Sequence, residues 1–346
     1  MSYDPLNTPN DPHTADAASP VTASDAATAS DAATASDAAT ASDAASPVTA
    51  SDTATASDAA TAGRTDAAGT PDPRDNAPEA PHLDFAGSTP YEDYVHADVL
   101  THLQELRSED PGEMVFLVTT QVMELWFTVL VHEWETAARA LREDDLPRAL
   151  DALRRSRREL EALNASWLPL AGLTPAQFNS YRGALGEGSG FQSAMYRRLE
   201  FLLGEKSAAM LVPHKGTARA HAELEKALHE PGLYDEALRF LARRGHPVPP
   251  SVLDRDLSRR YEPSEEVEAV WAEIYQGDQR GEEVRLGEAL TDVGELVWRW
   301  RNDHLTATRR AMGSKQGTGG SAGVAWLEKR AAKSVFPELW TARGRV

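Results

Sequence analysis

The chain has no cysteine among its 346 residues. This absence excludes disulfide bonds, zinc–thiolate sites, iron–sulfur clusters and a haem ligated by a thiolate. Any metal ion in this protein must therefore be held by histidine or carboxylate side chains.

A surplus of basic residues is also lacking, because the formal net charge is −19. The first 85 residues carry 14 acidic side chains and only two basic ones, Arg64 and Arg74, which gives 2 − 14 = −12 and leaves −7 for the other 261 residues. The acidity therefore belongs mainly to the N-terminal segment. Nothing in this charge balance favours nucleic acid or an anionic membrane as a partner.

The sequence has little that resembles a targeting or membrane segment. The first residues lack a basic region followed by an apolar one, which a secretory signal would show. The longest uninterrupted apolar runs are shorter than a membrane span. We therefore expect a soluble, cytoplasmic protein.

Large apolar side chains are nearly missing from the first 85 residues. Residues 24–62 repeat a near-hexapeptide, ASDAAT, with interruptions at Ser46-Pro47 and Asp52-Thr53. Such a segment cannot bury enough apolar surface to offset the entropy of ordering its backbone. We predict that residues 1–85 form a disordered low-complexity tail, and that residues 86–346 form the folded domain. A tail without a function of its own is the preferred interpretation, and a role in solubility, spacing or partner binding is the alternative.

From Pro90 onward the sequence is rich in Leu, Ala, Glu and Arg and has helical periodicity, whereas strand-like alternation is missing. Turn signals such as Pro111-Gly112 separate the helices. The predicted helices span residues 91–108, 113–142, 146–164, 174–185, 190–203, 217–228, 232–243, 265–276, 282–311 and 321–333. The sequence thus predicts an all-α, bundle-like domain built around the two long helices 113–142 and 282–311.

The stretch from Trp298 to Gly323 joins an aromatic, Arg-rich helical segment to a loop with five glycines. His304 lies within the helical part. One imidazole on a helix beside a glycine-rich cover is a plausible way to build a cofactor site with a lid, although a single histidine on a helix is more often packed or exposed. The loop is not a Walker loop, because Lys315 precedes its glycines instead of following them.

Four segments carry motifs that belong together. They are the series His304, Arg309, Gly313, Lys315, GTGG at 317–320 and FPELW at 336–340; EMVFLVTTQVMELWFTVLVHEWETA from Glu113; YEDYVH at 91–96; and LTPAQFNSYRGALGEGSGFQSAMYRRLEFLLG at 173–204. Together they resemble the tryptophan 2,3-dioxygenase family of haem enzymes. The resemblance covers residues 91–204 and 282–340; residues 205–281 match only loosely.

This resemblance implies haem b as cofactor, with His304 as the proximal ligand of its iron. A neutral imidazole suits a ferrous haem that binds O2 without the strong electron push of a thiolate. By the same resemblance, Ser189 and Gly190 lie close to the haem edge. The protein is then expected to be a homo-oligomer, a tetramer as is typical of the family.

The resemblance also implies where the substrate binds. Phe116 packs beside an indole ring, and Phe178 faces the same pocket at a position where the family often has tyrosine. Thr120 occupies the position of the family's distal histidine, which hydrogen-bonds the indole N–H. Thr120 cannot act as a base and is shorter than an imidazole.

Two further parts of the resemblance concern the amino-acid end of the substrate and the neighbouring subunit. Arg182 corresponds to the residue that clamps the substrate carboxylate, a role to which a guanidinium fork is well suited. Thr318 corresponds to a residue that binds the ammonium and carboxylate groups as the loop closes. Tyr91, Tyr94 and Val95 correspond to a segment that reaches a neighbouring subunit's site.

The implied reaction is cleavage of the indole C2–C3 bond of L-tryptophan, or of a tryptophan derivative, by O2 to an N-formylkynurenine-type product. Thr120 and Phe178 favour one alternative, the insertion of a single oxygen atom into a substituted indole. A third interpretation is a haem-binding sensor without turnover.

Overall fold

The computed structural model describes residues 83–318 and 323–346, and within these residues it contains helices and no β-strand. The predicted all-α class is confirmed. The predicted disordered tail, residues 1–85, lies almost entirely outside the described residues, as do positions 319–322 of the glycine-rich loop.

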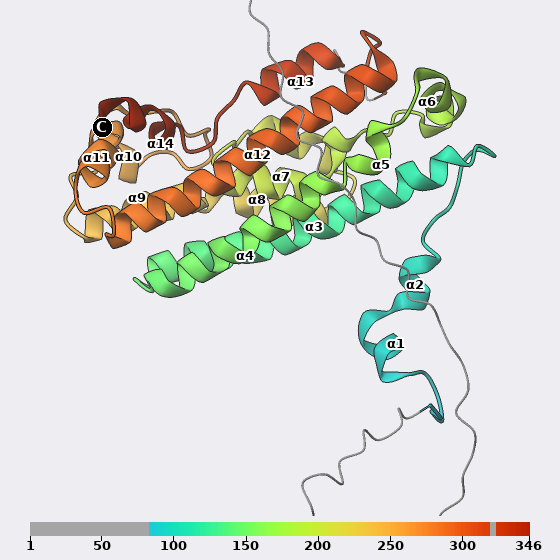
Figure 1. Cartoon of the computed structure of the whole chain (residues 1–346), viewed down its shortest axis with the longest axis horizontal. Coiled ribbons are helices and arrows are strands. Elements are labelled where there is room, and N and C mark those ends of the chain that lie inside the picture. Colours follow the sequence, from blue (N-terminus) through green and yellow to red (C-terminus); the bar gives the residue numbers. More distant parts are fainter. Residues whose placement is uncertain (1–82, 319–322) are drawn as a thin grey trace, which may run out of the picture. The chain divides into compact units, whose positions relative to one another are not determined.

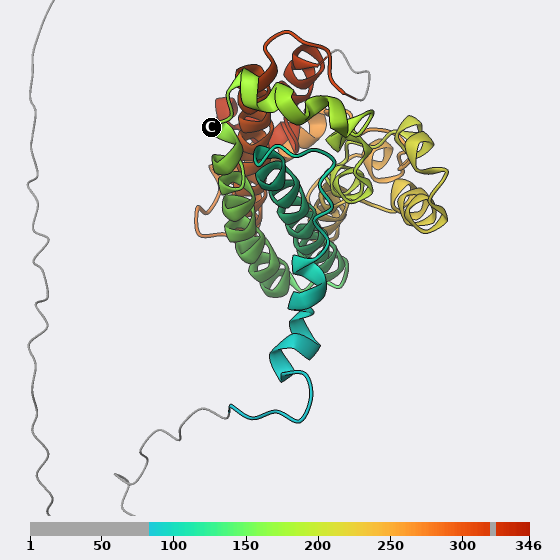
Figure 2. The same ribbon diagram turned by 90° about the vertical axis from the view of Figure 1, so that its right-hand side faces the viewer.

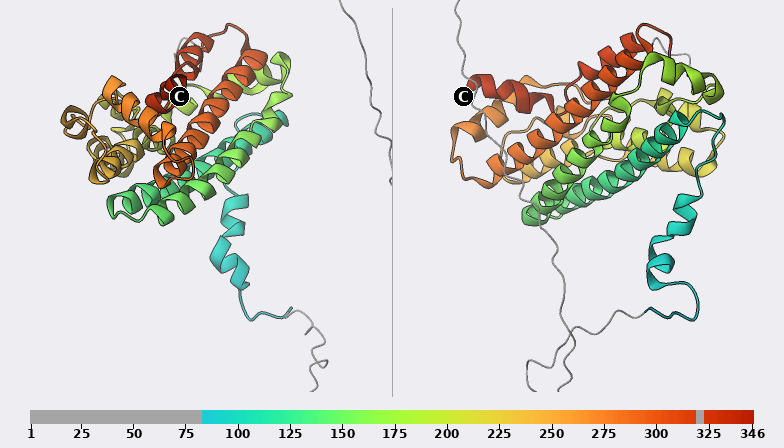
Figure 3. Two further views of the ribbon diagram at one scale, coloured as in Figure 1. Left: turned by 60° about the vertical axis from the view of Figure 1, so that its left-hand side comes forward. Right: turned by 45° about the vertical axis from the view of Figure 1, so that its right-hand side comes forward.

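Three helices form the centre of the domain (Figures 1 and 3). They are α3 (Gly112–Arg142), α4 (Leu146–Ala165) and α12 (Glu282–Met312). α3 and α4 form a hairpin, in which Asp144 takes the left-handed conformation at φ 59° and the Asp145 side chain caps α4 by accepting from the Arg148 N–H. α4 packs against both long helices, so it separates α3 from α12 along its own length.

The core is apolar and closely packed. Leu130, Trp134 and Leu141 of α3, together with Leu286 and Leu290 of α12, are each completely buried. Burial of such side chains contributes roughly 1.5–3 kcal/mol apiece, and this accounts for the helical periodicity of both long helices. α7 (Ala194–Leu202) and α9 (Leu233–Arg243) pack on the other side of α3.

Residues 205–281 form helices beside this centre, in yellow and light orange in Figure 2. The elements are η3 (Ala208–His214), α8 (Ala218–His229), α9, α10 (Pro250–Leu253) and α11 (Glu265–Gln276). The C-terminal elements α14 (Pro337–Thr341) and η4 (Ala342–Arg345) pack against α11. The short elements η3, α10 and α14 were not predicted, because a few residues are too short to show a period.

One buried carboxylate ties the C-terminal segment to residues 205–281. Glu338 is 1% exposed, and its oxygens accept hydrogen bonds from the hydroxyls of Tyr234 at 2.9 Å and Tyr261 at 2.7 Å and from the Ser264 N–H at 2.8 Å. Burial raises the pKa of Glu338, although the hydrogen bonds oppose this. Because its oxygens receive three donors, the buried side chain is well satisfied and holds these segments in register.

The prediction of one helix over residues 91–108 is wrong. The structure has two short helices instead, α1 (Pro90–Val95) and α2 (Ala97–Thr101), with His96 between them at φ 55° in the left-handed region. Neither helix buries a residue, so tertiary packing does not favour a longer helix. Both lie to one side of the bundle, at the start of the described chain (Figure 1).

The segment before α7 also differs from the prediction of a helix over residues 190–203. A 3-10 turn, η2 (Gly190–Gln192), is followed by Ser193 in an extended conformation, and α7 begins only at Ala194. Before this segment come α5 (Leu168–Ala171), α6 (Pro175–Arg182) and η1 (Gly183–Leu185). After the glycine-rich loop, α13 (Val324–Ala331) lies within the predicted helix 321–333.

α3 combines length with high hydropathy. Within the described residues it is the one helix that could cross a membrane by length and composition. Its most apolar 18 residues have a mean hydropathy of 1.8, and 28% of this stretch is buried in the protein. Polar residues such as Gln121 and Glu124 interrupt the apolar runs of this helix, so the statement about uninterrupted runs is not contradicted. The criterion is weak evidence for a membrane, because the core helix of a soluble protein also meets it, but it draws attention to the exposed face of α3.

Candidate active site

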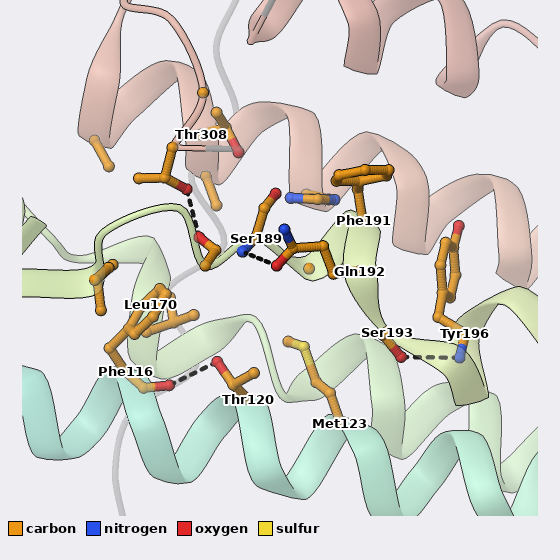
Figure 4. A pocket seen from close by; sticks show the side chains of 18 of the residues that line it. Phe116, Thr120, Met123, Leu170, Ser189, Phe191, Gln192, Ser193, Tyr196 and Thr308 are labelled. Atoms are coloured by element: carbon orange, nitrogen blue, oxygen red, sulfur yellow. Dashed lines mark hydrogen bonds between the residues drawn. The ribbon is translucent and has the colours of Figure 1, made fainter. Parts of the chain in front are cut away.

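A cavity of about 680 Å3 opens between α3 and α12 beyond the C-terminal end of α4. α4 fills the space between the long helices up to Ala165, and past that point α5, α6 and the segment around Ser189 form the remaining walls. Figure 4 looks into this cavity, with α3 along one side and α12 along the other. A volume of this size is typical of a cofactor or ligand site.

The cavity brings together most of the residues predicted from the sequence. The predicted site residues in its lining are Phe116, Thr120, Phe178, Ser189, Gly190, His304 and Thr318. They come from α3, α6, α12 and two loops, so they are distant in sequence and meet only in the fold. Their shared position agrees with a single site, and their individual roles stay predictions.

His304 lies on α12 and its ring stacks on the indole of Trp167, with ring centroids 4.8 Å apart and planes 16° from parallel. The imidazole is half-buried, since it faces the cavity. Burial among apolar walls lowers the pKa of His304 to about 4. The ring is therefore neutral at physiological pH, and a neutral imidazole has a nitrogen lone pair for a metal.

The described residues contain no group of three or more histidine, aspartate or glutamate side chains placed to hold a metal ion. The cavity therefore offers a bare ion His304 and separate carboxylates such as Glu124, but no set of three ligands within the described residues. A metal that brings its other ligands with it, as the iron of a porphyrin does, needs just one protein ligand. The neutral imidazole and the large cavity therefore fit a haem.

Aromatic rings of α3 and α6 form another part of the cavity wall. Phe116 of α3 lies with its ring centroid 6.0 Å from that of Phe178 and 5.8 Å from that of Tyr181, both on α6. A capping box made by Thr174 and Gln177 fixes the start of α6 and so the direction of these rings. Tyr181 is completely buried and outside the cavity lining, so Phe116 and Phe178 form the apolar surface that is suited to another flat aromatic group.

Thr120 lies one turn after Phe116, and its hydroxyl donates a hydrogen bond to the Phe116 carbonyl at 2.9 Å. Since the proton is used in this bond, the lone pairs of the hydroxyl oxygen remain to accept a donor in the cavity. Glu124, a further turn along α3, also lines the cavity, and burial raises the pKa of its carboxyl, opposed by a hydrogen bond with Ser193.

Arg182 lies outside the lining of this cavity. It lines an adjoining polar pocket that shares Gly317 and Thr318 with the large one, and its Nη2 donates to the carbonyl of Gln316. Two more contacts hold the loop in place, since Lys315 Nζ donates to Asn179 Oδ1 at 3.0 Å and Thr318 Oγ1 donates to the Gly188 carbonyl at 2.6 Å. These contacts attach residues 315–318 to α6 and to the segment before η2.

The predicted residues of α1 are not brought to the cavity. Tyr91 is 67% exposed and Tyr94 is 87% exposed, and neither of these residues nor Val95 lines either pocket. Within one chain they therefore have no part in the site.

A comparison with protein families decides the classification. The tryptophan 2,3-dioxygenase family model matches residues 76–346. The chain belongs to the tryptophan 2,3-dioxygenase family. The match includes residues 205–281, so the segment that resembled the family only loosely is part of the same family domain.

Individual relatives agree. A tryptophan 2,3-dioxygenase from Bordetella pertussis is 42% identical over 266 residues, which cover 77% of this chain and 94% of the relative. One from Burkholderia pseudomallei is 40% identical over 286 residues, covering 78% and 94%. Tryptophan 2,3-dioxygenase 1 from Ralstonia nicotianae is 40% identical over 262 residues, covering 75% and 89%.

Sequence reasoning gave no role to Arg197 or Arg330, which belong to one group of charged cavity residues. Arg197 and Arg301 line the cavity and are 1% and 4% exposed, and Arg330 joins them from α13. Their common partner is Glu200, which is 1% exposed. The sequence could have indicated a buried ion pair here, because Arg197 and Glu200 stand three residues apart in an otherwise largely apolar helix.

Proposed function

We propose that this chain is a haem-dependent dioxygenase that cleaves the indole C2–C3 bond of L-tryptophan or a tryptophan derivative with O2, giving an N-formylkynurenine-type product. The observation that carries the proposal is the position of His304, whose imidazole lines a cavity of about 680 Å3 that Phe116 and Phe178 also line. The family membership and the relatives' names support tryptophan as the substrate.

In this proposal His304 ligates the haem iron, and Ser189 and Gly190 border the cofactor. The haem, when bound, supplies the oxygen chemistry. The protein's contribution is binding, orientation and the exclusion of water. Phe116 and Phe178, which pack against each other and line the cavity, form the apolar wall on which the indole packs.

The polar residues fix the two ends of the substrate. The Thr120 oxygen accepts the indole N–H, because its own proton is already donated to the Phe116 carbonyl. Arg182 binds the carboxylate, and Thr318 binds the carboxylate and the ammonium group. To bind the substrate, Arg182 gives up its hydrogen bond to the Gln316 carbonyl. Thr318 likewise gives up its hydrogen bond to the Gly188 carbonyl. The loop therefore opens and recloses around each substrate molecule.

The proposal is tested by reconstituting the full chain with haem and adding L-tryptophan. We expect a Soret band that depends on His304, a shift of this band with the substrate, and a product that contains both atoms of labelled O2. A haem-loaded protein without a Soret shift and without turnover on any indole amino acid would refute the enzyme and favour the sensor.

The single-oxygen alternative is favoured by Thr120 and Phe178, which make the indole face different from that of the family's usual pattern. Insertion of one atom from O2 leaves the other to be reduced to water, which requires two electrons from a reductant. Mass spectrometry separates the two reactions, because dioxygenation adds two oxygen atoms and opens the ring. Monooxygenation adds one atom and consumes reductant in equal amounts.

Thr120→Val is expected to lower kcat/KM for L-tryptophan about 10-fold, because the buried indole N–H then loses its acceptor. Thr120→Ser keeps an acceptor and should stay close to the native value. The same variants assayed on 1-methyltryptophan, which has no indole N–H, should differ little from each other. A Thr120→Val enzyme that loses equal activity on both substrates would contradict the hydrogen bond.

The exposed face of α3 supports a homo-oligomer, which we propose to be the tetramer typical of the family. Its exposed apolar side chains alternate at intervals of three and four residues: Val115, Val118, Val122, Leu125 and Val129. This spacing is typical of a helix that packs against another helix. A second copy of the chain offers the same stripe, as a two-fold interface requires. Tyr91 and Tyr94 would then be able to reach the site of another subunit.

Leu125→Asp is expected to reduce the mass of the particle measured by light scattering, because Leu125 is 53% exposed at the centre of the stripe. Burying an unpaired carboxylate against apolar side chains is strongly unfavourable. Thr306→Asp on the exposed surface of α12 is the control and should keep the native mass. A native chain that is monomeric at micromolar concentration would exclude the interface.

A further inference from the structure

The chain between α2 and α3 forms part of the cavity wall. Leu103, Glu105 and Arg107 line the cavity, whereas the residues between them, Gln104 and Leu106, do not. Side chains that alternate in this way are typical of an extended backbone, in which successive side chains point to opposite sides. Residues 103–108, the wall segment, therefore present one side to the cavity.

Gln121 of α3 holds the start of the wall segment. Its Nε2 donates to the Leu103 carbonyl at 3.2 Å, and its Oε1 accepts from Gln104 Nε2 at 2.7 Å. Gln104 Nε2 also donates to the Leu100 carbonyl at 2.9 Å, which connects this contact to α2. The backbone of Leu103 is thus fixed beside Gln121, which follows Thr120 on α3.

Glu113 holds the other end of the wall segment. It is 3% exposed, and its carboxylate accepts from the N–H of Arg107 at 2.8 Å, from the N–H of Ser108 at 2.7 Å and from the Ser108 hydroxyl. The hydrogen bonds from Ser108 and Arg107 hold the pKa of Glu113 below its usual value, so the carboxylate is charged at neutral pH. Hydrogen bonds to a charged acceptor are stronger than those between neutral groups, so this end is firmly attached.

The two attachment points enclose the part of α3 that faces the proposed substrate. Glu113 and Gln121 are eight residues apart on the helix, which is roughly 12 Å along its axis. Six extended residues reach at most roughly 20 Å, so the wall segment spans this distance without coiling. Phe116 and Thr120 lie between the two attachment points on α3 (Figure 4), and the wall segment therefore runs beside them.

We infer that the wall segment limits the size of the aromatic ring that the cavity accepts, with Leu103 as the specificity-determining contact and Glu113 and Gln121 as positioning residues. This inference rests on the proposed function, in which the indole lies beside Phe116 and Thr120. Leu103 is 54% exposed although it is apolar and lines the cavity, so a bound ring removes part of its surface from water. The favoured substrates are tryptophans without an added group on the edge of the ring that meets Leu103.

Leu103→Ala tests the contact, and Leu106→Ala is the matched control. Leu106 is 41% exposed in the same segment and does not line the cavity. The haem-loaded full chain is assayed on L-tryptophan and on its 5-, 6- and 7-methyl derivatives. One carbon more or less in an apolar pocket changes kcat/KM roughly 10- to 200-fold.

We expect Leu103→Ala to raise KM for L-tryptophan about 5-fold while kcat changes less than about 2-fold, because the ring loses an apolar contact. For at least one methyl derivative, kcat/KM relative to that of L-tryptophan should rise about 10-fold, since the methyl group occupies the space that Leu103 leaves. Leu106→Ala should keep the native ratios for all four substrates.

Glu113→Gln tests the positioning role, because it keeps the size of the side chain and removes its charge. With weaker hydrogen bonds to the wall segment, KM for L-tryptophan should rise about 3-fold, and the preference for methyl derivatives should shift in the same direction as in Leu103→Ala. The Soret band of the haem-loaded protein should stay as in the native chain. Glu109→Gln, which removes an exposed carboxylate from the same stretch of chain, should keep the native constants.

The possible outcomes separate this inference from the proposed function. If the native chain turns over no indole amino acid, the proposed function fails and this inference with it. If the native chain turns over L-tryptophan and Leu103→Ala keeps the native order of preference, only this inference fails. A Leu103→Ala particle of lower mass in light scattering, with unchanged preference, would show instead that Leu103 contacts a second copy of the chain. If Glu113→Gln lowers kcat equally on all four substrates, its positioning role is overturned.

Discussion

His304→Ala is expected to abolish activity, with kcat/KM reduced about 1,000-fold or more, because the proposed protein ligand of the haem iron is lost. The titration with haem should show weaker binding and a Soret band that no longer resembles that of a histidine-ligated iron. His304 faces a cavity, and its ring contacts are with Trp167 and Trp300. The smaller side chain is therefore accommodated without loss of the fold, which circular dichroism would verify.

A matched control is His132→Ala, since His132 lies on the exposed surface of α3 and outside the cavity lining. It should keep both the Soret band and the activity. Added imidazole should restore part of the histidine-ligated spectrum to His304→Gly. Full activity in His304→Ala would contradict the assignment of this residue as the ligand.

The lowered pKa of His304 predicts that the stability of the haem-free protein depends on pH. Burial lowers the pKa of His304 to about 4, whereas an unfolded histidine titrates near 6.5. The unfolded chain therefore binds this proton more readily, so the stability of the haem-free protein falls as the pH drops from about 6.5 towards 4. In the folded protein His304 stays neutral above its lowered pKa of about 4, so the histidine-ligated Soret band should persist to about pH 5. The measurement is an absorbance titration paired with thermal unfolding.

The sequence was informative where a helix presents a regular face. The periodicity of α3 and α12 predicts two long helices, and the motifs on them place Phe116, Thr120 and His304 on surfaces that meet in the fold. Local capping signals were also sufficient for α6, because Thr174, Pro175 and Gln177 act within a few residues of one another. These features depend on short-range rules, which a single sequence displays.

The features that were missed depend on contacts across long distances in the chain. The break at His96 occurs in a segment that buries no residue, so helical propensity alone did not determine its length. Arg330 and Glu200 pair across 130 residues of sequence. Whether such charges meet in a buried cluster or stay in solvent is decided by packing, and neither spacing nor composition indicates it.

The position of Arg182 in the pocket beside the cavity also depends on packing between distant segments, and it bears on substrate specificity. Arg182→Met is expected to lower kcat/KM for L-tryptophan about 100-fold or more, because a carboxylate bound by two parallel hydrogen bonds loses both. Arg182→Lys should recover only part of this loss, since an ammonium group cannot form the same pair of bonds. Turnover of tryptamine, which has no carboxylate, should be nearly the same in all three proteins.

A second explanation of such a loss is that Arg182 only fastens the loop through the carbonyl of Gln316. Asn179→Ala separates the two explanations, because it removes the contact with Lys315 that fastens the same loop and leaves the guanidinium in place. We expect this variant to change kcat/KM less than about 3-fold for both substrates. If Asn179→Ala and Arg182→Met cause equal losses, and tryptamine suffers as much as tryptophan, then Arg182 holds the loop and a different group recognises the carboxylate.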